Sequence, residues 1–146
     1  MATITAELES GTRVSISNGR HSWSADEPPE VQGTDTGPNP YELLLGSLAA
    51  CTCITLSLYS RHKGIALESV SASYDFDRVH ADDCQDCDDD AAGMIDRIQS
   101  HVKIAGEFDD AQRKRLVQIT QRCPVHKTLA AGVHMVDDVE FKRSGF

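Results

Sequence analysis

A long uncharged segment in the first half of the chain constrains the fold more than any other feature. Residues 43–60 contain no Asp, Glu, Lys or Arg, and helix-start signals come directly before them. Asn39 can cap a helix, Pro40 suits the first helical position, and Glu42 stands three residues after the cap. Gly64 provides a stop signal. The sequence therefore predicts one helix that is apolar on nearly all sides and has to be enclosed by other elements.

The length and polarity of this helix favour a globular core over a membrane span. The uncharged segment barely reaches the ~18 residues that a span requires. It also contains several small or hydroxyl-bearing residues: Gly46, Ser47, Thr52, Thr55, Ser57 and Ser60. We interpret the helix, which should run to about His62, as the buried central helix of a globular domain.

The residues before the helix predict strands and a loop. Residues 2–9 and 12–18 alternate apolar and polar side chains, which is typical of a β-hairpin. Residues 20–25 are expected to form a third strand after the tight-turn dipeptide at Asn18. The segment 26–37 is rich in Pro and Gly and is expected to be a loop.

The residues after the helix predict two strands, two helices and a last strand. The strands are expected at 67–79 and 94–107, the helices at 110–122 and 124–131, and the last strand at 133–141. Strands and helices that do not alternate regularly indicate the α+β class. A chain of 146 residues suffices for one core, so we expect a single domain over residues 1–146.

Composition narrows the classes of function. The net charge of −9 argues against nucleic-acid binding and against a polybasic membrane surface. The first residues do not resemble a secretory signal, so we expect a cytoplasmic protein. Five cysteines in such a chain indicate thiol reactivity or metal binding rather than a disulfide framework.

Cys51, Cys53 and Cys123 have different predicted environments. Cys51 lies in the middle of the long helix and is either a buried inert thiol or a reactive one. Cys53 is about 200° further around the helix and faces nearly the opposite way. Cys123 precedes Pro124 and should cap the last helix, whose free N–H groups favour a thiolate, so local physics indicates the lowest pKa there. His126 is either a general base or simply an exposed side chain.

Cys84 and Cys87 form a C-x-x-C pair inside an acidic segment, 82–90. With His80 they supply three ligands, one fewer than a closed zinc site needs. The neighbouring carboxylates should raise the thiol pKa, which disfavours a redox role. Zinc binding, redox chemistry and a functionally silent insert all stay open for this segment.

Two motifs give the chain a resemblance to the OsmC/Ohr family, the osmotically inducible and organic-hydroperoxide-resistance proteins. The first motif covers 33–45 and continues into Ala49-Ala50-Cys51, and the second covers 123–129. The resemblance implies an intertwined homodimer in which antiparallel sheets wrap long central helices. It also implies that Cys51 attacks a hydroperoxide, that Cys123 resolves the product as a disulfide, and that a dithiol, a lipoyl protein in relatives, regenerates the enzyme. We expect no cofactor and no metal.

The resemblance also concerns an arginine and a glutamate beside the attacking thiol. Glu42 matches the family glutamate, which holds an arginine from the preceding loop, although a capping role explains Glu42 equally well. The matching loop, 26–37, contains no arginine; Arg20 and Arg61 are the substitutes that the sequence offers.

The sequence thus predicts a thiol peroxidase that reduces organic hydroperoxides through Cys51 and Cys123, in defence against oxidative stress. The alternative is a protein on the same scaffold that binds or senses a small molecule without turnover.

Overall fold

The structure, a computed structural model, describes residues 2–80 and 93–143. The chain begins with a three-stranded antiparallel sheet in the order β1-β2-β3. Its strands are β1 (Thr5–Ser10), β2 (Arg13–Ser17) and β3 (Ser22–Ala25). At the β2–β3 turn, Gly19 has a φ of 95° and the Asn18 side chain accepts the N–H of His21 at 2.7 Å. The predicted hairpin and third strand are confirmed.

The long helix, α1 (Pro40–Lys63), follows a loop that contains one 3-10 turn, η1 (Pro29–Val31). Its start is the predicted capping box. The Asn39 side chain accepts the N–H of Glu42 at 2.9 Å, and the Glu42 carboxylate accepts the N–H of Asn39 at 3.2 Å. Gly64 ends the helix in the left-handed conformation, with a φ of 66°.

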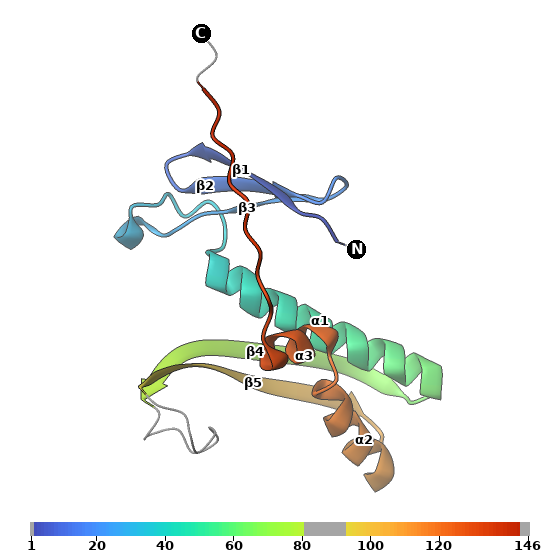
Figure 1. Cartoon of the computed structure of the whole chain (residues 1–146). Helices are drawn as coiled ribbons and strands as arrows, with labels where there is room; N and C mark the ends of the chain where they lie inside the picture. Colours follow the sequence, from blue (N-terminus) through green and yellow to red (C-terminus); the bar gives the residue numbers. More distant parts are fainter. Residues whose placement is uncertain (1, 81–92, 144–146) are drawn as a thin grey trace.

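A long antiparallel hairpin and two shorter helices complete the domain. The hairpin consists of β4 (Leu67–His80) and β5 (Met94–Gly106), and the helices are α2 (Asp110–Thr120) and α3 (Pro124–Ala131). The second helix ends two residues before the predicted Arg122. Figure 1 shows α1 lying between the β4–β5 hairpin and the β1–β3 sheet.

The core lies between α1, α2 and the β4–β5 hairpin. Leu56 of α1 is completely buried and packs with Leu116 and Ile119 of α2. Partly buried residues surround this cluster: Tyr59, Ile65, Val70, Val102, Ile104 and Phe108. Mixed helices and antiparallel sheets confirm the predicted α+β class.

The helix α1 is enclosed on one side only. Its length and composition would allow it to span a membrane, a test that the core helix of a globular domain also passes. Its buried residues recur every four positions and face the β4–β5 hairpin: Leu48, Thr52, Leu56 and Ser60. On its other faces, Ile54 and Leu58 are exposed. The expected complete enclosure is therefore not reached within the single chain.

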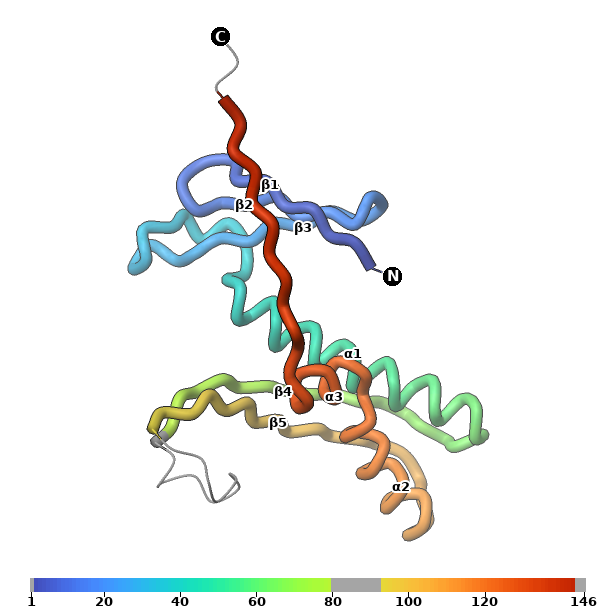
Figure 2. Tube along the Cα trace, in the orientation of Figure 1, coloured from blue at the N-terminus to red at the C-terminus, as the bar shows by residue number. Residues whose placement is uncertain are grey.

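The predicted last strand, 133–141, is wrong for the single chain. These residues run as an extended arm away from α3 and the β4–β5 hairpin (Figure 2), and no strand is assigned to residues 133–143. The alternating apolar pattern was the reason for expecting a strand, but a strand also needs a neighbour for its backbone N–H and C=O groups. Phe141 of this arm is 93% exposed.

Candidate active site

Cys51 and Cys123 meet where α1 packs against α3. Cys51 is half-buried in the middle of α1, and Cys123 is the N-cap residue of α3 with no exposed surface. The two thiols share a hydrogen bond. The fold thus brings together two thiols that are 72 residues apart in the chain (123 − 51), so that each changes the pKa of the other.

Hydrogen bonds lower the pKa of Cys51. Partial burial opposes ionisation of this thiol, but three hydrogen bonds to its sulfur outweigh that effect. The partners are the Cys123 thiol, the backbone N–H of Val125 and the hydroxyl of Thr55, whose Oγ1 lies 4.0 Å from the Cys51 Sγ; to a Cys51 thiolate each of them can only donate. Donors directed at the charged form favour it, so Cys51 is the thiol prepared to ionise.

The pKa of Cys123 is raised, which corrects the prediction from the α3 N-terminus alone. Burial has the largest effect, and the hydrogen bond with Cys51 adds to it, because Cys123 gives its proton to that bond. The backbone N–H groups of His126 and Val125 act in the opposite direction, as a helix N-terminus should. The sequence alone could not show that the Cys123 side chain is fully buried and that its thiol interacts with Cys51.

His126 has an exposed side chain, and its contact with Cys123 is made through its backbone N–H. His126 instead lines a cavity of about 310 Å³ between α1, α3 and the β4–β5 hairpin, and neither cysteine is among the lining residues. Within the described part of the chain, the hydrogen bonds that shift either cysteine's pKa include none from the imidazole. The exposed-side-chain interpretation of His126 therefore fits the structure better than the general-base interpretation.

This cavity has apolar walls and a few polar groups. It lies between α1, α3 and the β4–β5 hairpin, and its lining residues are Leu48, Tyr74, Asp96, Ile98, Ser100, His126, Leu129 and Ala130. The Tyr74 hydroxyl hydrogen-bonds that of Thr52 at 2.7 Å, which joins β4 to α1 one residue after Cys51. Arg78 pairs with Asp96 at 2.8 Å, so the acidic group in the wall has a cationic partner.

Glu42 acts as the capping residue of α1 in the structure. Its carboxylate accepts the Asn39 N–H, and no described arginine is paired with it. The sequence offered two candidates for the cation. Arg61 lies in the last turn of α1 and lines the same cavity as Cys53, and Arg20 lies in the turn between β2 and β3. Neither is among the groups that shift the pKa of Cys51. The structure therefore does not join Glu42, an arginine and Cys51.

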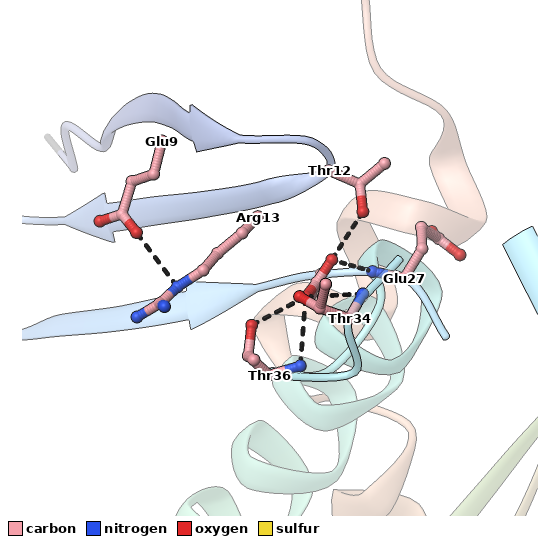
Figure 3. A network of polar contacts seen from close by, with 7 residues as sticks. Glu9, Thr12, Arg13, Glu27, Thr34 and Thr36 are labelled. Atoms are coloured by element: carbon pink, nitrogen blue, oxygen red, sulfur yellow. Dashed lines mark hydrogen bonds and ion pairs between the residues drawn. The ribbon is translucent and has the colours of Figure 1, made fainter. Parts of the chain in front are cut away.

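The loop before α1 is organised by a buried carboxylate that sequence reasoning did not single out. Asp26 is only 2% exposed, and its oxygens accept hydrogen bonds from the hydroxyls of Thr12, Thr34 and Thr36 at 2.6–2.7 Å (Figure 3). These hydroxyls are the main reason why the pKa of Asp26 lies far below its ordinary value; burial opposes them, and the Glu27 N–H adds to them. The sequence did carry a signal for this network: an aspartate directly after a strand, followed by a Thr-x-Thr pattern at 34–36.

The remaining cysteines lie elsewhere. Cys53 lines a separate cavity with Ser57 and Arg61, facing away from Cys51 as the helical spacing predicted. Cys84 and Cys87 lie outside the described residues, as does the side chain of His80. The described residues contain no cluster of three potential metal ligands.

Comparisons with known proteins agree with this architecture. The family model described as OsmC-like protein matches residues 33–136. An OsmC-like protein from Mycoplasma pneumoniae is 23% identical, with a TM-score of 0.69 over 89% of this chain and 87% of that one. An organic hydroperoxide resistance protein OsmC from Legionella pneumophila is 20% identical, with a TM-score of 0.60 over 87% of each chain.

The organic hydroperoxide resistance protein OhrB of Bacillus subtilis is 19% identical, with a TM-score of 0.55 over 87% of this chain and 88% of that one. The search of curated proteins found no match. At these identities the solved structures establish the fold, while the family model covers most of the sequence. The chain belongs to the OsmC-like protein family.

Proposed function

We propose that this protein reduces organic hydroperoxides by a two-cysteine mechanism. The observation that carries the proposal is the hydrogen-bonded pair of Cys51 and Cys123, in which the pKa of Cys51 is lowered and that of Cys123 is raised. A thiolate is the nucleophile in such chemistry, and a protonated neighbour suits the resolving role. The names of related structures, among them hydroperoxide resistance proteins, support the substrate class.

The reaction follows from the order in which the thiols ionise. The Cys51 thiolate attacks the distal oxygen of the hydroperoxide, the O–O bond breaks, and the alcohol leaves with a proton, so that Cys51 becomes a sulfenic acid. The Cys123 sulfur then attacks the Cys51 sulfur, giving a disulfide and water. An external dithiol, such as a lipoyl group on a protein partner, reduces this disulfide by exchange and is itself oxidised.

The cavity between α1, α3 and the β4–β5 hairpin supports an organic substrate. Leu48, Ile98 and Leu129 give it an apolar lining, and its volume of about 310 Å³ is in the lower range for small-molecule pockets. Two of its lining residues, Leu48 and His126, each stand three residues along the chain from one of the cysteines. Burial of an alkyl tail contributes roughly 0.8 kcal/mol for each CH₂ group. Hydrogen peroxide has no apolar group to bury and gains no binding free energy from this lining. We therefore expect a preference for hydroperoxides that carry an apolar group.

Two substitutions test the proposal directly. Cys51→Ser should abolish consumption of cumene hydroperoxide in the presence of a dithiol, because serine is not ionised at neutral pH. Cys123→Ser should still consume one equivalent and then accumulate a sulfenic acid that dimedone traps on Cys51. Cys53→Ser is the matched control and should turn over normally, since Cys53 faces another cavity. Unchanged turnover in the Cys51 variant would refute the mechanism.

We also propose that two copies of the chain associate and act in the cytoplasm, where thiols are kept reduced. The support is apolar surface that one chain leaves uncovered. It includes Ile54 and Leu58 of α1 and most of the apolar residues of the C-terminal arm. A second copy of the chain could cover this surface, and it is present wherever the protein is made.

Ligand binding or sensing without turnover is the second candidate function. The observation that favours it is the absence, among the described neighbours that shift the pKa of Cys51, of any arginine or lysine. Stopped-flow measurement of hydroperoxide consumption separates the two functions, since a binding protein would not consume the peroxide.

A further inference from the structure

The environment of Cys51 is built from hydrogen-bond donors rather than from cations. Three groups reach its sulfur: the Cys123 thiol, the Val125 N–H and the Thr55 hydroxyl. On the α3 side, Cys123 is the titratable group that shifts the pKa of Cys51. On the sheet side, Tyr74 is bound to Thr52 rather than to the sulfur. Of the three donors, Thr55 is the side chain that can be changed without removing a reacting atom or altering the backbone.

We propose that Thr55 is a catalytic residue, whose hydroxyl donates a hydrogen bond to the Cys51 sulfur and takes the place of a charged group beside the nucleophile. This inference rests on the proposed function, because it concerns the activation of the same thiol. It differs from the sequence-based expectation, in which Glu42 and an arginine supply the activation.

Helix geometry places Thr55 correctly for this role. It stands four residues after Cys51, so the two side chains lie on the same face of α1, one turn apart. The separation of 4.0 Å between Oγ1 and Sγ is at the long end for a hydrogen bond to sulfur. Hydrogen bonds to ionised groups are shorter and stronger than neutral ones, so the contact should tighten when Cys51 ionises.

Other hydroxyls in the helices have different partners. A helical threonine commonly donates to the carbonyl four residues back. Thr128 does so, to Pro124 at 3.0 Å, and Thr52 instead shares its hydrogen bond with Tyr74. The Thr55 hydroxyl instead contacts the Cys51 sulfur. Its β-branched side chain also restricts χ1, which limits the entropy lost in aiming the hydroxyl.

Loss of the hydroxyl has a calculable consequence. A hydrogen bond to a charged group is worth at least about 1.5 kcal/mol, which corresponds to roughly a tenfold change in the ionisation constant of Cys51. A more basic thiolate is about threefold more nucleophilic per unit of pKa. Thr55→Val should therefore react about threefold more slowly at neutral pH and about threefold faster at high pH. A merely structural effect would not produce such a crossover.

The experiment measures the alkylation rate of Cys51 by iodoacetamide in the full-length protein, with peptide mapping to separate the cysteines. We expect Thr55→Val to raise the pKa of Cys51 and to show the crossover. Thr55→Ser, which keeps the hydroxyl, should remain within about twofold of the parent protein. Thr52→Val is the matched control: it removes a neighbouring hydroxyl that does not contact Cys51, and should leave the pH profile unchanged.

Two outcomes overturn the inference: an unchanged pH profile in Thr55→Val, or an equal shift in Thr52→Val. Peroxide turnover, measured in parallel on the same samples, keeps the two proposals distinct. If the parent protein does not consume hydroperoxide while Thr55→Val still shifts the pH profile, the proposed function fails and the role of Thr55 stands. If turnover occurs and the profiles coincide, the proposed function stands and the role of Thr55 fails.

Discussion

Asp26 shows how a single buried charge can organise the approach to an active-site helix. Its carboxylate accepts hydrogen bonds from hydroxyl groups of the β1–β2 turn and of the far side of the loop. It therefore joins two segments that precede α1. The N–H of Asp26 itself is bound to the carbonyl of Pro38, directly before the helix cap. A buried ion is tolerated when hydrogen bonds replace its hydration, and six do so here.

The ionisation of Asp26 predicts a specific pH dependence of stability. Its pKa is lower in the folded protein than the ordinary 3.8, so its contribution is fully present above about pH 4 and is lost as the pH falls below that value. Asp26→Asn should therefore lower the free energy of unfolding at pH 7, and the difference from the parent should shrink in acid. Urea unfolding at several pH values measures this difference.

Asp35→Asn is the control for the Asp26 variant, because Asp35 is an exposed residue of the same loop whose positive φ asparagine also tolerates. It should change stability little at any pH. An Asp26→Asn difference that stays constant down to pH 2 would contradict the assigned role of the carboxylate.

At the level of elements, the capping box of α1 offers a test of Glu42. In the structure, Glu42 holds the helix start through the Asn39 N–H. Glu42→Gln keeps an oxygen that can accept this hydrogen bond, so it should leave helix stability and the reactivity of Cys51 nearly unchanged. Asn39→Ala removes the cap and should cost about 1 kcal/mol in free energy of unfolding. Urea unfolding and Cys51 alkylation check both variants.

A large loss of Cys51 reactivity in Glu42→Gln, without a loss of stability, would contradict the capping role. It would restore the arrangement that the family resemblance implies, in which Glu42 fixes an arginine.

The elements were predictable from sequence where local signals suffice. The Asn39 cap, Gly64 and Pro124 all mark boundaries through backbone chemistry that needs no tertiary contact. The ionisation order of Cys51 and Cys123 was not predictable locally, because it depends on burial and on a contact between two helices. The Asp26 network was missed for the same reason: its donors come from segments separated by up to 14 residues.

At the scale of the whole molecule, the C-terminal arm leaves a row of apolar side chains uncovered in the single chain. The alternation of its side chains predicted a strand at 133–141, but none of the described strands pairs with this segment. Apolar side chains are exposed along the arm: Val133, Met135, Val136, Val139 and Phe141. An exposed apolar surface of this extent is typical of an interface.

A second apolar surface of the chain lies between α1 and the N-terminal sheet. There, Ile16, Trp23 and Leu43 line an open cavity of about 610 Å³. In an intertwined dimer, the arm of one copy and the open faces of the other would cover each other, and the expected strand would find its partner. The unmet prediction and the exposed surface thus have one common explanation.

We predict that replacing Val136 and Phe141 together by Asp converts a dimer into monomers. Burial of each side chain is worth at least about 1.5 kcal/mol, so the pair should weaken association by roughly a hundredfold or more. Light scattering coupled to gel filtration, over a range of protein concentrations, measures the mass. A control with Asp137 and Lys142 both changed to Ser alters the polar residues of the same arm and should remain dimeric. A parent protein that is monomeric at every concentration would contradict the dimer, and the exposed arm would then need another partner.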